Sequence, residues 1–138
     1  MGLKFELIAN RCQEINAALT RLDRLAQLSR EEFLDSEDAQ DIASYRLLVA
    51  IEGCLDLCYH ISSKKLEKLP EEYAACFGNL EEAGILPSEL TEKLKNMARF
   101  RNLLVHRYWD VDYALVFEFI QNDLGIIKEF ITIVQALV

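Results

Sequence analysis

The stretch that decides the fold is residues 47–57, which read Leu47-Leu48-Val49-Ala50-Ile51-Glu52-Gly53-Cys54-Leu55-Asp56-Leu57. It lies inside residues 37–61, a segment with helical periodicity that is nearly apolar over the quoted part. A helix that is apolar around most of its girth is buried on several sides. We therefore expect this helix to run through the core. Ser36, followed by Glu37 and Asp38, is its predicted N-cap.

Four further segments show helical periodicity or helix-end signals: residues 3–28, 70–83, 88–108 and 113–137. Pro70 suits the first turn of the second of these, and Gly84 suits the position just past its end. The last segment is apolar on more than one face. It fits a well-buried bundle helix or a helix that also forms a subunit interface. We expect an all-α, up-and-down helical bundle of about five helices that forms a homodimer.

Length and composition agree with one helical domain spanning residues 1–138. Hydrophobic residues make up 51% of the chain and charged residues 28%, and only 2 Pro and 5 Gly occur, which favours helices over a many-turned β-fold. The amino terminus lacks the pattern of a secretory signal. No apolar run approaches the roughly 18 residues that cross a bilayer. A cytoplasmic protein without membrane contact is expected.

The four cysteines, Cys12, Cys54, Cys58 and Cys76, predict reduced core thiols. The spacing of Cys54 and Cys58 is a weak metal signal, because no histidine or cysteine cluster accompanies it. We therefore expect no metal site and no cofactor.

The charge is unevenly distributed along the chain. The formal net charge is −8, which argues against a surface that grips nucleic acid everywhere. Residues 91–108, however, hold five basic residues against one acidic residue. Helix C-termini favour Lys and Arg, which explains part of this excess. It does not explain the choice of Arg beside His.

Residues 101–108 carry the candidate chemistry. Arg101 presents a planar fork of donors that can hold a phosphate in a bidentate way. A histidine such as His106 can act as both base and acid near neutral pH. Without a metal, the two suit cleavage of RNA by its own 2′-hydroxyl, with Arg101 neutralising the transition state. Asn102 is expected to add an orienting hydrogen bond.

Helix geometry limits how these residues can meet. On a continuous helix Arg101 and Tyr108 share a face, because seven residues make about two turns. His106 is rotated roughly 140° from Arg101, at roughly 100° for each of five residues. Either the backbone leaves helical geometry near residues 105–108, or a second copy of the chain supplies the partner group. This favours a composite site at a two-fold axis.

Each motif residue also has an interpretation without chemistry. Arg101 can form a salt bridge to an acidic neighbour, and His106 can be a hydrogen-bonded histidine at a helix end. Tyr108 can be a half-buried interface aromatic. Spacing alone favours these interpretations, because an Arg-x4-His match arises often by chance.

The match to a known family extends beyond the motif. Over about residues 3–130 the chain resembles the HepT family of HEPN-domain toxins, most clearly in residues 46–52, 55–57, 60–61, 84–86, 97–108 and 111–112. The family pattern, Arg-x4-His-x-Tyr, is met by Arg101, His106 and Tyr108. The resemblance implies an all-α homodimer whose two motifs line one cleft. It also implies a metal-independent endoribonuclease toxin with Arg101 and His106 as catalytic residues.

The resemblance further implies a partner and a switch. The partner is a cognate antitoxin, a minimal nucleotidyltransferase, which silences the toxin by transferring AMP from ATP to Tyr108. The added phosphodiester brings negative charge and bulk to a cleft that should bind RNA phosphate. A second interpretation remains open: a non-catalytic subunit that presents substrate or nucleotide to a nucleotidyltransferase.

Overall fold

The computed structural model describes residues 2–106 and 108–138, and of Tyr108 it describes the backbone. These residues contain seven α-helices and two short helical turns. In chain order they are α1 (Phe5–Leu25), α2 (Arg30–Leu34), α3 (Glu37–His60), the π-helical turn η1 (Ile61–Lys65), α4 (Tyr73–Glu82), α5 (Ser88–His106), the 3-10 turn η2 (Tyr108–Asp110), α6 (Tyr113–Asn122) and α7 (Leu124–Gln135). The predicted all-α fold is confirmed.

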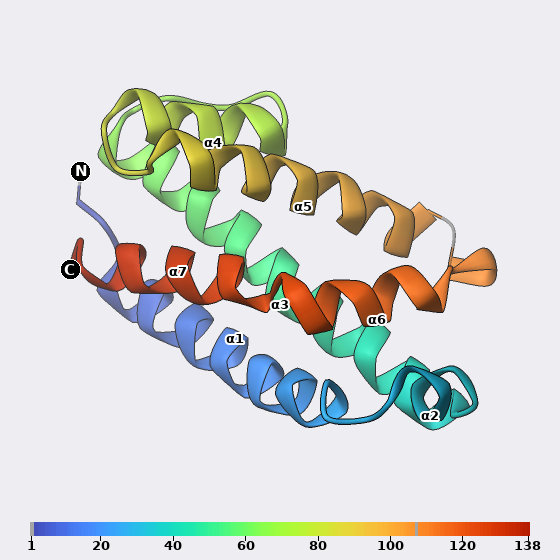
Figure 1. Cartoon of the computed structure of the whole chain (residues 1–138). Coiled ribbons are helices and arrows are strands. Elements are labelled where there is room, and N and C mark those ends of the chain that lie inside the picture. The colour runs from blue at the N-terminus through green and yellow to red at the C-terminus, as the bar shows by residue number, and fades with distance from the viewer. Residues whose placement is uncertain (1, 107) are drawn as a thin grey trace.

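The long helices form an up-and-down bundle around α3 (Figure 1). Helix α1 packs along α3, and α5, α6 and α7 also contact it. Helix α4 packs on α5 and on the last turns of α3. The two ends of the described chain lie at the same end of the bundle, where Phe5 and Val138 line one small surface pocket.

Two helix ends lie where the sequence predicted them, the start of α3 at Ser36 and the end of α4 at Gly84. The Ser36 hydroxyl accepts a hydrogen bond from the Ala39 amide at 3.1 Å, as expected of an N-cap. Gly84 follows the C-cap of α4 with a φ of 79°, and the Ile85 amide donates to the Leu80 carbonyl at 2.9 Å. This left-handed residue ends the helix at the predicted position, because a glycine adopts positive φ without steric cost.

Three boundaries differ from the prediction. Residues 29–36 were expected to be a non-helical connection, but they contain α2. The start of α2 is a capping box, in which the Ser29 hydroxyl accepts from the Glu32 amide and the Glu32 carboxylate accepts from the Ser29 amide. The expected single helix over residues 113–137 is divided at Asp123, which ends α6 and precedes α7. Pro70 lies before α4, not in its first turn, because the backbone stays extended at Glu72 (φ −148°, ψ 166°).

The core is apolar and close packed around α3. Leu47, Ile51 and Leu55 on this helix have no exposed surface, and Phe130 and Val134 on α7 are equally buried. This burial of α7 favours the core interpretation of the last segment over an interface along α7. All four cysteines are buried and free, as predicted, and burial raises the pKa of the Cys54 and Cys58 thiols.

Helices α1 and α3 are in close contact at Gly53. A Cβ atom at this position would lie 2.6 Å from Ile15 Cγ1, and Ile15 itself has no exposed surface. No real side chain tolerates that distance, so residue 53 is a glycine because α1 passes directly over it.

Gly53→Ala should lower the free energy of unfolding by about 1–3 kcal/mol through overpacking, partly offset by roughly 1 kcal/mol of helix propensity. Gly78→Ala is the matched control, because nothing lies within 4 Å of a Cβ atom in that α4 position. It should be neutral or stabilising. Urea unfolding followed by circular dichroism measures both variants, and equal stabilities would contradict the close-contact explanation.

Candidate active site

Arg101 reaches from α5 to the core helix α3. Its Nε donates to Glu52 Oε1 in an ion pair. The two side chains are 20% and 34% exposed, so the pair lies at the edge of the core with access to solvent. The salt bridge considered from the sequence is therefore present. It engages one nitrogen of the guanidinium.

Two further residues hold the same guanidinium. Arg101 Nη1 donates to Asn102 Oδ1 at 3.2 Å. The orienting role expected of Asn102 in the reaction stays a prediction. The guanidinium carbon of Arg101 also lies 5.7 Å from the ring centroid of Tyr73, at the start of α4. A cation at this distance is attracted by the ring quadrupole. Residues from α3, α4 and α5 thus fix one positive charge at the surface.

His106 lies apart from this cluster within the chain. It is the last residue of α5 and is exposed, and no hydrogen bond or ion pair joins it to Arg101 in residues 2–106 and 108–138. The regular helix α5 ends there, which agrees with one of the two alternatives left open by helix geometry, and η2 begins with the Tyr108 backbone. The Tyr108 side chain lies outside the described part of the structure.

Glu52 and Tyr73 contact the Arg101 guanidinium, but neither was predicted from the sequence to belong to the site. Glu52 carried a usable signal, because it is a charge inside the apolar run 47–57, where a carboxylate requires a partner. Tyr73 carried none, because the contact depends on how α4 folds back onto α5.

In residues 2–106 and 108–138 no group of three or more His, Cys, Asp or Glu side chains is placed to hold a metal ion. None of the helices described is both long and apolar enough to span a membrane.

The fold, with an Arg-x4-His motif at the end of α5, places the chain in the class of HEPN-type helical proteins. The model of the family described as "Ribonuclease HepT-like" matches residues 15–134. The chain belongs to this family, which confirms the family and the ribonuclease class expected from the sequence.

Individual relatives agree with the family match. The mRNA nuclease HepT of Shewanella oneidensis is 24% identical over 131 residues, covering 95% of this chain and 98% of that protein. The tRNA nuclease HepT of Aphanizomenon flos-aquae is 29% identical over 111 residues, covering 80% and 76%. The tri-AMPylated HEPN toxin of Shewanella oneidensis, solved in complex with its MNT antitoxin, superposes with a TM-score of 0.85 at 24% identity, covering 94% and 97%.

The Arg101–Glu52 pair should show a measurable coupling. In a double-mutant cycle of Arg101→Ala and Glu52→Ala, thermal unfolding should give a coupling free energy of about 1 kcal/mol, because the pair is partly buried. The pair Lys68–Glu82, whose side chains are 47% and 73% exposed, is the control and should give about 0.3 kcal/mol or less. Equal coupling free energies in the two cycles would contradict the conclusion that Glu52 holds the Arg101 guanidinium in place.

Proposed function

We propose that this chain is a metal-independent endoribonuclease toxin, with Arg101 and His106 as its catalytic residues. The single observation that carries the proposal is the guanidinium of Arg101, which Glu52 and Asn102 hold near the end of α5, about 1.4 turns before His106. Membership of a ribonuclease family supports it. Its substrate is RNA, and its place of action is the cytoplasm.

The proposed reaction uses the RNA's own 2′-hydroxyl. This oxygen attacks the neighbouring phosphorus and loses its proton to a base. The bond from phosphorus to the 5′-oxygen breaks, and an acid returns a proton to that oxygen. The products are a 2′,3′-cyclic phosphate and a 5′-hydroxyl, so no metal-bound water takes part. Histidine suits both proton transfers.

Arg101 would stabilise the extra negative charge on the phosphorus oxygens. A guanidinium has five N–H donors, and Glu52 and Asn102 engage Nε and Nη1. The remaining donors can bind a phosphate while the group stays oriented. Prior fixing of the cation favours catalysis, because little reorganisation is needed as charge develops.

We further propose that two copies of the chain complete the site. One imidazole cannot be base and acid in the same step, and Arg101 and His106 are not joined within one chain. A dimer would bring a second His106 to the cleft. Three large apolar residues beside the motif, Leu103, Trp109 and Leu115, are 46%, 74% and 45% exposed. Exposed apolar surface of this kind is common where subunits meet.

Cleavage of RNA by the untagged protein with EDTA present tests the site. Arg101→Ala and His106→Ala should each lower the rate by about 10²–10⁴-fold, the usual effect of losing a proton-transfer or charge-stabilising group. Arg99→Ala is the matched control, because Arg99 is exposed and bonded only to Asn96 in the described chain.

Equal rates in all variants would reject the assignment, and loss of cleavage on adding EDTA would reject the metal-free reaction. ATP binding without any RNA cleavage would instead favour the subunit that presents nucleotide to a nucleotidyltransferase.

We propose Tyr108 as the residue through which a minimal nucleotidyltransferase antitoxin silences the toxin. The phenol oxygen would attack the α-phosphorus of ATP, releasing pyrophosphate and the phenol proton. The Shewanella oneidensis HEPN toxin noted above is AMPylated and bound to an MNT antitoxin, which supports this partner. Each adenylate would add one negative charge to the toxin and oppose the binding of RNA phosphate.

Incubation with the partner and ATP should raise the mass by whole AMP units, measured by intact-protein mass spectrometry. Tyr108→Phe should abolish the gain, because its ring has no oxygen to accept the phosphorus. Tyr113→Phe, five residues away at the start of α6, should keep it. An undiminished gain in Tyr108→Phe would exclude Tyr108 as the acceptor.

A further inference from the structure

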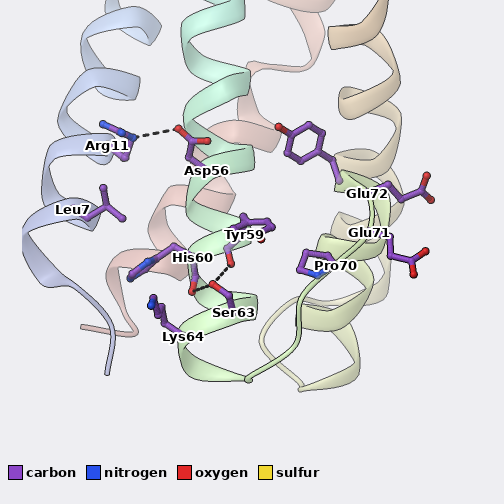
Figure 2. A pocket seen from close by; sticks show the side chains of 11 residues that line it. Leu7, Arg11, Asp56, Tyr59, His60, Ser63, Lys64, Pro70, Glu71 and Glu72 are labelled. Atoms are coloured by element: carbon purple, nitrogen blue, oxygen red, sulfur yellow. Dashed lines mark hydrogen bonds and ion pairs between the residues drawn. The ribbon is translucent and has the colours of Figure 1, made fainter. Parts of the chain in front are cut away.

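A cavity of about 850 Å³ is lined in part by Tyr73, the aromatic neighbour of Arg101. Figure 2 shows the side chains that line it. Three parts of the fold form it: the start of α1, the end of α3 with η1, and the segment that leads into α4. Its lining residues are Leu7, Arg11, Asp56, Tyr59, His60, Ser63, Lys64, Pro70, Glu71, Glu72 and Tyr73. Its volume falls within the usual range for small-molecule sites, about 300–1,000 Å³.

The cavity and the Arg101 cluster share one residue, Tyr73. Tyr73 lines the cavity and also lies 5.7 Å from the Arg101 guanidinium carbon. Along α3, Asp56 follows Glu52 by one helical turn, a rise of about 5.4–6 Å. A chain bound by its phosphate at Arg101 therefore has the cavity within reach of its next unit.

The walls of the cavity suit a flat and neutral group. Tyr59 and Tyr73 are 44% and 37% exposed, and Leu7 and Pro70 add apolar surface. Exposed tyrosine rings at the wall of a cavity offer stacking surfaces. Hydroxyl groups of the tyrosines and Ser63 can make hydrogen bonds at the rim.

Among the charged side chains of the cavity, Arg11 and Asp56 form an ion pair, and two glutamates point away from the cations. Arg11 forms two ion pairs: its Nε lies 3.4 Å from Asp56 Oδ2, and its Nη1 lies 3.3 Å from Glu14 Oε1. The carboxylates of Glu71 and Glu72 point away from Arg11 and Lys64 (Figure 2). His60 accepts a hydrogen bond at Nε2 from the Lys4 amide at 2.9 Å, which requires an unprotonated nitrogen. Burial lowers the pKa of His60, and Lys4 and Lys64 lower it further.

The turn η1 contributes to this shape. Its wider π-helical winding places Ser63 and Lys64 at the cavity, and the Ser63 hydroxyl donates to the Tyr59 carbonyl at 2.9 Å. Short π-helical turns within α-helices are frequent at functional sites. Lys64 forms no ion pair within residues 2–106 and 108–138, so it is the cation here best able to meet a neighbouring phosphate.

We propose that this cavity binds an unpaired nucleobase of the RNA strand, next to the phosphate held at Arg101, by stacking on Tyr59 and Tyr73. The inference rests on the proposed role of Arg101 as the phosphate-binding residue. It assigns substrate recognition to residues outside the Arg-x4-His-x-Tyr motif. The class of substrate it selects is single-stranded RNA whose bases are free to leave the stack.

Equilibrium binding to two single-stranded probes tests the proposal. One is a fluorescent oligodeoxyadenylate, and the other is the same backbone with every base removed. Neither has a 2′-hydroxyl, so neither is cleaved by the proposed reaction. Failure of the base site can therefore be told apart from failure of Arg101 and His106 in the cleavage assay.

Tyr59→Ala should weaken binding of the oligodeoxyadenylate roughly 5- to 150-fold, the effect of losing one stacking ring. It should leave binding of the base-free probe unchanged. Tyr59→Phe should keep wild-type affinity, because its ring still stacks. Tyr45→Ala is the matched control, since Tyr45 lies on the same helix, is 62% exposed and does not line the cavity.

Three results would overturn the proposal. Unchanged binding of the oligodeoxyadenylate to Tyr59→Ala would remove Tyr59 from recognition. Equal losses for both probes would mean that the ring supports the backbone and not a base. In a parallel titration with AMP, a Tyr59→Ala variant that loses AMP binding but keeps oligodeoxyadenylate binding would assign the cavity to a free mononucleotide.

Discussion

The ion pair between Glu52 and Arg101 is the constraint around which the site is arranged. Between residues 50 and 60, α3 is buried except at Glu52, Asp56 and Tyr59, which form one stripe along the helix. Carboxylates beside such a core lose part of their hydration and need partners. Arg101 from α5 pairs with Glu52, and Arg11 from α1 pairs with Asp56. The core helix is thus linked to two neighbours by charges one turn apart, and the cavity opens beside them.

The ion pair between Glu52 and Arg101 contributes less free energy to folding than the apolar core does. A partly exposed ion pair contributes about 1 kcal/mol or less. Each fully buried leucine or isoleucine contributes about 1.5–3 kcal/mol, and α3 alone buries Leu47, Ile51, Leu55 and Leu57 completely. Apolar packing therefore decides whether the chain folds. The ion pair decides the direction in which one guanidinium is held, and the Asn102 amide oxygen restricts it further.

The features predicted correctly from the sequence are those that depend on residues close together in the chain. The hydroxyl of Ser36 and the free φ of Gly84 act on their own neighbours, so both helix ends could be read directly. The break at Asp123 could not, because the apolar pattern continues across it into α7. The partner of Arg101 was also out of reach: Glu52 lies 49 positions away, and helical spacing relates only residues on one helix. The motif was visible in the sequence, whereas the residues that hold it depend on how the helices pack.

The net charge of −8 limits how this chain can hold RNA in the proposed complex. Affinity from phosphate contacts grows with the number of cations that replace counterions. Of the cations discussed at Arg101 and its neighbouring cavity, Arg101 and Arg11 already have carboxylate partners, and Lys64 is the one without an ion pair in the described chain. Stacking on an aromatic ring does not depend on net charge and loses little as salt rises. A base bound at Tyr59 would therefore supply the affinity that an acidic surface cannot, and would favour strands with unpaired bases. Every RNA carries the same phosphates, so discrimination among RNAs must come from groups such as these.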